Sequence, residues 1–123
     1  MLKGLLIAGC GGFLGTIFRF IINKIFPFSI SPFPIATFLV NLIGCFLFGI
    51  FIGLLQRNNL LNSNLYAFLI TGFCGGLTTF STFTNEMLTI SEKGDLSLFI
   101  LYIFLSLGLG FLALLAGRFI LTD

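Results

Sequence analysis

The sequence contains no histidine and no tryptophan among its 123 residues, and only 8% of the residues are charged. Without histidine there is no Ser-His-Asp or Cys-His triad and no imidazole to bind a metal ion. A soluble globular domain carries about 25% charged residues, so these few charges could not cover a folded surface in water. The net charge of +2 is too small to indicate a nucleic-acid partner. With 58% hydrophobic residues, the composition predicts an integral membrane protein in contact with lipid.

Motifs for enzyme chemistry are also missing. The chain has no Walker motif and no G-x-S-x-G, and no two acidic residues lie within one apolar window. The three cysteines, Cys10, Cys45 and Cys74, are odd in number and lack C-x-x-C spacing. We expect them to be small buried hydrophobic residues. The sequence therefore predicts that the protein is not an enzyme.

Four long apolar windows account for almost the whole chain. Residues 34–55, 65–85 and 96–117 contain no charged side chain, and each window reaches the roughly 20 residues that a helix needs to cross a bilayer. The first window is interrupted only by Arg19, which lies within snorkelling reach of its end. The prediction is an all-α, multi-pass protein of the cell (plasma or inner) membrane, one domain over residues 1–123. Its four transmembrane helices are expected at about residues 2–25, 34–55, 65–90 and 96–118.

The third window contains a weak point for a helix. Gly75 and Gly76 are followed closely by the β-branched Thr78 and Thr79, a poor combination for a continuous helix. Because this segment lies about halfway along the window, we expect the third helix to be broken near its middle. A membrane tolerates a broken helix only where the freed backbone groups line a cavity or hold an ion. The alternative is a kink whose freed groups bond to Thr and Ser hydroxyls.

Aromatic and hydroxyl side chains follow this weak point. Phe80 and Phe83 are three residues apart and share a helix face, and Ser81 and Thr82 lie between them. The positive edges of aromatic rings, next to hydroxyl donors, suit a small anion better than a cation. The alternative is that the two rings face lipid or the core, as most of the 18 Phe residues must.

Three further polar residues lie inside the windows, and a fourth directly follows the third window. Asn41 is the only amide deep in the second window, and it predicts either a hydrogen bond between helices or a pore-lining donor. Tyr102 and Ser106 share one face of the fourth helix, which indicates either bonding between helices or a polar pathway. Glu86, near the end of the third window, is expected to mark the membrane interface.

Lysine and arginine are divided equally between the two sides of the predicted helices. One side holds Lys3, Arg57 and Arg118, and the other holds Arg19, Lys24 and Lys93. Orientation in a membrane follows an imbalance of these residues, so the equal division predicts insertion in both orientations. The alternative is that something outside the chain sets the orientation. Mixed orientations favour an antiparallel homodimer about an axis in the membrane plane.

Three glycine pairs with a spacing of four residues predict close contacts between helices. The alternative is chance, because glycine is common in membrane helices. The pairs are Gly11 and Gly15, Gly49 and Gly53, and Gly72 and Gly76.

Taken together, three segments resemble the CrcB/Fluc family of fluoride channels, over essentially the whole chain. The most specific is GFCGGLTTFSTF at residues 72–83, and residues 11–19 and 37–44 resemble the first- and second-helix signatures. The resemblance implies an antiparallel, dual-topology homodimer with two pores. It implies passive export of fluoride, which relieves fluoride toxicity.

The resemblance also implies site residues. A structural sodium ion, which is not transported, would be held by the backbone carbonyls of Gly75 and Thr78 from both subunits. Gly110, one turn after the last pore residue, offers no hydroxyl where the polar track is expected to continue. The implied pore residues are Asn41, Phe80, Phe83, Ser81, Thr82, Tyr102 and Ser106.

Two other functions remain as alternatives. A small four-span, proton-coupled exporter of cationic drugs would need a carboxylate deep in a helix, for which Glu86 is the only candidate. An assembly factor without transport activity would not need the polar run of the third window.

Overall fold

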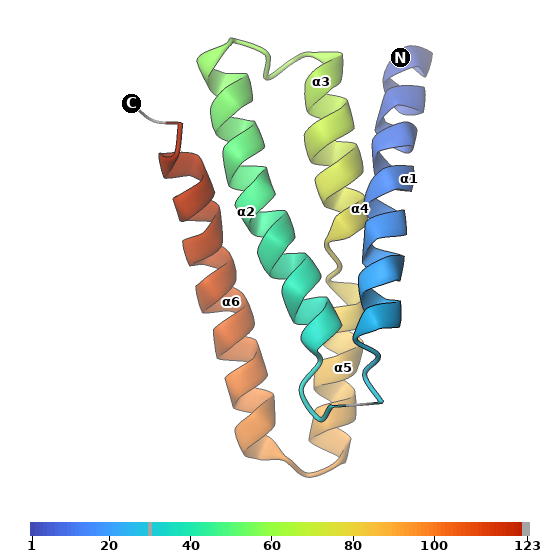
Figure 1. Ribbon diagram of the computed structural model, residues 1–123, viewed down its shortest axis with the longest axis vertical. Helices are drawn as coiled ribbons and strands as arrows, with labels where there is room; N and C mark the ends of the chain where they lie inside the picture. The colour runs from blue at the N-terminus through green and yellow to red at the C-terminus, as the bar shows by residue number, and fades with distance from the viewer. Residues whose placement is uncertain (30, 122–123) are drawn as a thin grey trace.

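The computed structural model describes residues 1–29 and 31–121, which form four helical segments running alternately up and down (Figure 1). All four are long and apolar enough to cross a membrane, so the predicted all-α architecture with four membrane-length helices is confirmed. The start of α1 and the end of α6 lie at the same end of the bundle (Figure 1). The elements are α1 (Leu2–Ile25), α2 (Ile35–Arg57), α3 (Asn64–Tyr66), the π-helix η1 (Ala67–Cys74), α4 (Gly75–Leu77), α5 (Ser81–Glu92) and α6 (Leu96–Phe119).

Local sequence explains several of the helix ends. Pro34 directly precedes α2, where its fixed φ favours a helix start. After α5 the chain turns through Gly94, whose φ of 78° lies in the left-handed region that favours glycine. The Asp95 carboxylate then accepts a hydrogen bond from the Leu98 amide at 3.0 Å and caps α6.

The third membrane segment is broken, as predicted, but not at its glycines. Gly75 and Gly76 are helical in α4; the chain leaves the helix at Thr78, whose ψ is 157°, and α5 begins at Ser81. The glycines remain helical because Gly76 packs against α1. A Cβ on Gly76 would lie 2.6 Å from the Gly12 carbonyl oxygen. The glycines therefore allow close packing against α1, and the helix breaks at the threonines that follow them.

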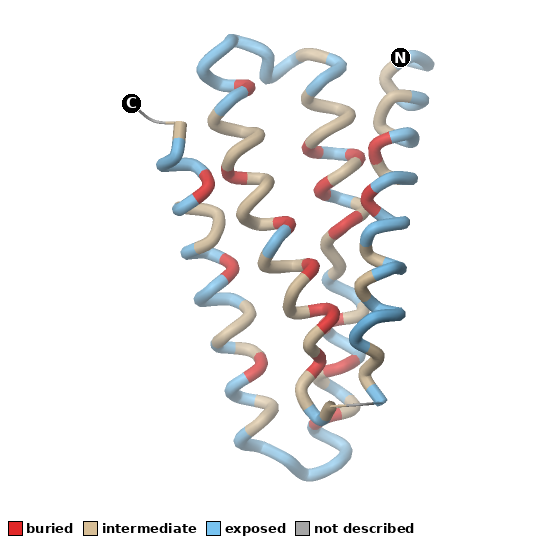
Figure 2. The backbone as a smooth tube through the Cα atoms, viewed as in Figure 1, coloured by how far each residue is buried: buried red, intermediate tan, exposed pale blue. Residues whose placement is uncertain are grey.

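The four segments pack as two close pairs, α1 with η1 and α4, and α2 with α6. At Gly15 a Cβ would collide with the Phe73 carbonyl and lie 2.8 Å from the Leu77 amide nitrogen. At Gly49 a Cβ would lie 2.9 Å from the Arg118 amide nitrogen. Glycines of the predicted pairs thus bring backbones together within the chain. Figure 2 shows buried positions along α2 and the third segment, with more exposed positions on α1 and α6.

Gly15→Ala should lower the free energy of unfolding by about 1–3 kcal/mol, the range typical of overpacking. The added methyl group would meet backbone atoms of η1 and α4, which cannot rotate away. The measurement is the unfolding transition in detergent, followed by circular dichroism. Gly9→Ala on the same helix is the matched control, because nothing lies within 4 Å of its Cβ position. Equal stability of the two variants would contradict the close packing of α1.

Candidate functional site

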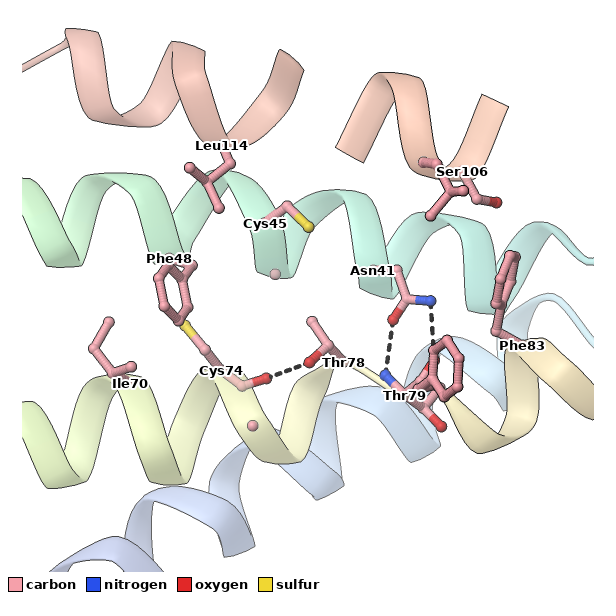
Figure 3. A pocket seen from close by; sticks show the side chains of 14 residues that line it. Asn41, Cys45, Phe48, Ile70, Cys74, Thr78, Thr79, Phe83, Ser106 and Leu114 are labelled. Carbon is pink, nitrogen blue, oxygen red and sulfur yellow. Dashed lines mark hydrogen bonds between the residues drawn. The ribbon is translucent and has the colours of Figure 1, made fainter. Parts of the chain in front are cut away.

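A cavity of about 370 Å³ lies beside the break, between α2, the third membrane segment and α6 (Figure 3). None of the described residues that line it is charged. Of the predicted site residues, the structure brings Asn41, Gly75, Thr78, Phe80, Phe83 and Ser106 to this cavity. The other three predicted residues, Ser81, Thr82 and Tyr102, do not line it.

Asn41 bonds to both backbone groups of Thr79, in the middle of the break. Its Nδ2 donates to the Thr79 carbonyl at 3.1 Å, and the Thr79 amide donates to Asn41 Oδ1 at 2.8 Å (Figure 3). Because these two groups have left the helical ladder, they need another partner in the membrane. Of the two interpretations of Asn41, the structure shows the hydrogen bond between helices, made at the edge of the cavity.

Because of the break, two backbone carbonyls lose the amide donors that they would have in a continuous helix. In a continuous helix the Thr79 amide would donate to the Gly75 carbonyl and the Thr82 amide to the Thr78 carbonyl. Instead, the Thr79 amide donates to Asn41, and the Thr82 amide donates to Thr79 Oγ1 at 3.3 Å. The carbonyls that lose these helical donors belong to the two residues predicted to hold a cation.

Arg19 reaches the break rather than the end of its helix. Its Nε donates to the Gly76 carbonyl at 3.0 Å, although the sequence places this residue within snorkelling reach of the helix end. The amide that would serve Gly76 in a continuous helix belongs to Phe80, beyond the break. The guanidinium of α1 therefore replaces a helical donor in the third segment.

The two predicted ring residues lie next to each other in different environments. The Phe80 and Phe83 ring centroids are 6.3 Å apart at an interplanar angle of 45°. Phe83 is buried and packs against Tyr102, with centroids 4.9 Å apart. Phe80 is 78% exposed in the single chain. The Phe83 ring is thus fixed by packing in the core, while the Phe80 ring lies at the open side of the cavity.

Glu86 is buried within the chain. Its carboxylate accepts hydrogen bonds from the Thr37 hydroxyl and, at 3.1 Å, from the Tyr102 hydroxyl. Tyr102 therefore bonds between helices, one of its two predicted roles. Thr37 was not singled out from the sequence, although it lies four residues before Asn41 and so shares a face of α2 with it. The four-residue spacing from Asn41 was the sequence signal that could have identified Thr37 as part of the same polar face.

The hydroxyls of the predicted polar track are separated in space. Ser106 Oγ is buried and has no hydrogen-bond partner within the described chain. Ser81 is exposed and Thr82 is half-buried. Gly110 faces Cys45, whose Sγ lies 3.5 Å from the position of a Gly110 Cβ. A thiol therefore stands where the sequence led us to expect a further hydroxyl.

Asn41→Ala should lower the free energy of unfolding by about 1–3 kcal/mol, because it removes the partner of both Thr79 backbone groups. The Thr79 amide should also exchange faster with deuterium. Both are measured in detergent, by circular dichroism and by mass spectrometry. Asn58→Ala is the control, since its Nδ2 donates to the Leu54 carbonyl at an exposed position. An unchanged exchange rate at Thr79 would contradict the role given to Asn41.

Comparison with known proteins identifies the family of the chain. Residues 6–118 match the family model described as CrcB-like protein, Camphor Resistance (CrcB). A relative from Azobacteroides pseudotrichonymphae is 44% identical, covering 100% of this chain and 98% of the relative. One from Flavobacterium psychrophilum is 40% identical, covering 99% of each. Both relatives are named fluoride-specific ion channel FluC. With its four membrane-length helices, the chain is a multi-pass membrane protein, and it belongs to the CrcB family.

Proposed function

We propose that this protein is a fluoride-selective ion channel, not an enzyme, and that it lets fluoride leave the cell passively. The observation that carries the proposal is the cavity at the break, which combines an amide, hydroxyls and three aromatic rings without a charged residue in its described lining. Relatives that match almost the whole chain are named fluoride-specific ion channels.

The chemistry of the cavity suits fluoride. The ion is small and strongly hydrated, so a pore must replace its water with closely placed donors. Conduction also requires that binding be weak enough for release, and a fixed cation in the lining would trap the ion. The unpartnered hydroxyl of Ser106 and the ring edges of Phe80 and Phe83 are such donors. Asn41 holds the break beside them.

Outward movement of fluoride needs no energy source other than the membrane potential. A membrane potential contributes about 2.3 kcal/mol per elementary charge for each 100 mV, and a negative cell interior drives an anion out. Because HF is a weak, membrane-permeant acid, fluoride accumulates in a cell that is less acidic than its surroundings. A passive pore is then sufficient to relieve fluoride toxicity.

The working unit is an antiparallel homodimer with two pores. In the single chain Phe80, Ser81, Thr84 and Asn85 are exposed, next to backbone that is not helical. Lipid does not tolerate irregular backbone or bare polar groups at membrane depth, so a second copy covers this face. The equal division of lysine and arginine supports copies in opposite orientations. In this dimer Ser81 and Thr82 extend the polar track, and Tyr102 positions Phe83.

A structural sodium ion lies at the dimer centre and is not transported. The carbonyls of Gly75 and Thr78 would hold it, because the break has removed their regular helical donors. Two such carbonyls from each copy form an oxygen cage, which is the ligand type that hard cations prefer. A Cβ at Gly75 would meet only the Ile70 carbonyl, at 3.8 Å, so within one chain this position is open toward a partner.

Phe80→Ile and Phe83→Ile should each lower fluoride efflux from liposomes by about tenfold or more, which corresponds to ~1.4 kcal/mol in the barrier. Isoleucine keeps apolar bulk but removes the ring edge. Phe104→Ile is the control for Phe80, since Phe104 is equally well exposed, on α6. Phe38→Ile is the control for Phe83, since Phe38 packs in the same cluster but does not line the cavity.

Efflux is measured with a fluoride electrode, and gel filtration confirms that each variant stays folded. If both ring variants conduct as well as their controls, the ring-edge mechanism is wrong.

Removing sodium should weaken the dimer and stop fluoride efflux, although sodium itself does not cross the membrane. Thr78→Ser should keep the effect of sodium, because a backbone carbonyl is the ligand. Gly75→Ala should weaken it, because the added methyl group crowds the centre of the dimer while fitting the single chain. The measurements are gel filtration and efflux with sodium replaced by a large organic cation. Full efflux and an intact dimer without sodium would argue against the ion.

A further inference from the structure

Two of the three cysteines lie in the wall of the cavity. Cys45 belongs to α2 and Cys74 ends η1, and both line the cavity together with Asn41. In Figure 3 both sulfur atoms lie on the opposite side of Asn41 from Phe83, and that of Cys74 lies next to Phe48. Cys10 is exposed on α1 and Cys45 is half-buried, so the expectation that all three cysteines are buried holds for Cys74 alone. All three thiols are free of disulfides.

The packing fixes both thiols in this wall. Gly110 of α6 stands opposite Cys45 and leaves room for its sulfur, which lies 3.5 Å from the position of a Gly110 Cβ. The Cys74 carbonyl accepts two hydrogen bonds from Thr78, from the amide at 3.0 Å and from the hydroxyl at 2.8 Å (Figure 3). These bonds hold the backbone of Cys74, whose side chain is buried.

Thiol sulfur is a soft ligand and selects soft metals. Apart from Asn41, Thr78, Thr79 and Ser106, the residues that line the cavity with the two cysteines are apolar or glycine, and they include Phe48, Ile70 and Leu114. A bare metal cation would lose its hydration there at high cost, whereas a neutral metal halide would not. The geometry therefore fits an uncharged compound of a soft metal better than a free ion.

We propose that Cys45 and Cys74 form a site for neutral soft-metal compounds, such as mercuric chloride, inside the cavity. At each thiol an S–Hg bond forms and one Hg–Cl bond breaks. The thiol proton and the chloride leave to solvent, and the oxidation states do not change. The metal group then occupies the space through which an anion would pass. This last consequence, closure of the pore, rests on the proposed function.

Intact-mass spectrometry tests the site without using transport. Cys10→Ala protein in detergent, treated with mercuric chloride, should carry an adduct on Cys45 and another on Cys74. Adding Cys45→Ala or Cys74→Ala should remove one adduct each, and a protein with all three substitutions should carry none. Absence of adducts from both Cys45 and Cys74 overturns the site.

Closure is tested in liposomes. The Cys10→Ala protein should lose most of its fluoride efflux on treatment, and dithiothreitol should restore it. The triple variant should keep its own untreated efflux. Equal inhibition of the triple variant, or adducts on both cysteines without loss of efflux, overturns closure of the pore. If the untreated protein passes no fluoride, the proposed function fails, while the adduct count still decides whether the thiol site exists.

Discussion

The pair of hydrogen bonds between Asn41 and Thr79 is the interaction on which the candidate site depends. It stabilises an irregular stretch of backbone at membrane depth, where unsatisfied polar groups are costly. Because the Thr79 amide bonds to α2, it no longer serves the Gly75 carbonyl. The same break lets α5 begin at Ser81 and sets Phe80 outside the core and Phe83 within it.

Groups from other helices satisfy much of what the break exposes. Arg19 of α1 bonds to the Gly76 carbonyl, and Asn41 of α2 bonds to Thr79. Further along, Thr37 and Tyr102 satisfy the buried Glu86 carboxylate. What stays open in the described chain is the Ser106 hydroxyl at the cavity, and the Gly75 and Thr78 carbonyls lack their regular helical donors. Because these groups lack their regular partners, a bound ion would interact with them most favourably.

The helices could be predicted because, in an uncharged window of membrane length, a helix is one of the few structures that satisfy every backbone hydrogen bond without water. Asn41 and the hydroxyls after Gly76 stood out in the sequence because polar groups are costly in lipid, whereas the resemblance to the family implied the full set of site residues. The exact place of the break was not predictable, because it depends on packing between Gly76 and α1. The inward turn of Arg19 and the burial of Glu86 likewise depend on partners distant in the sequence. The π-helix η1 has the same apolar composition as its neighbours, so no local signal distinguishes it. The dimer, its orientation and the sodium ion remain predictions.

The most direct measurement is ion efflux from liposomes that contain the purified, unmodified protein. Liposomes are loaded with equal concentrations of fluoride and chloride, and a potassium gradient with valinomycin sets the membrane potential. Ion-selective electrodes then follow both anions. A selective pore predicts rapid release of fluoride driven by the potential, while chloride stays inside. Equal release of both anions, or retention of fluoride as in protein-free liposomes, would contradict it.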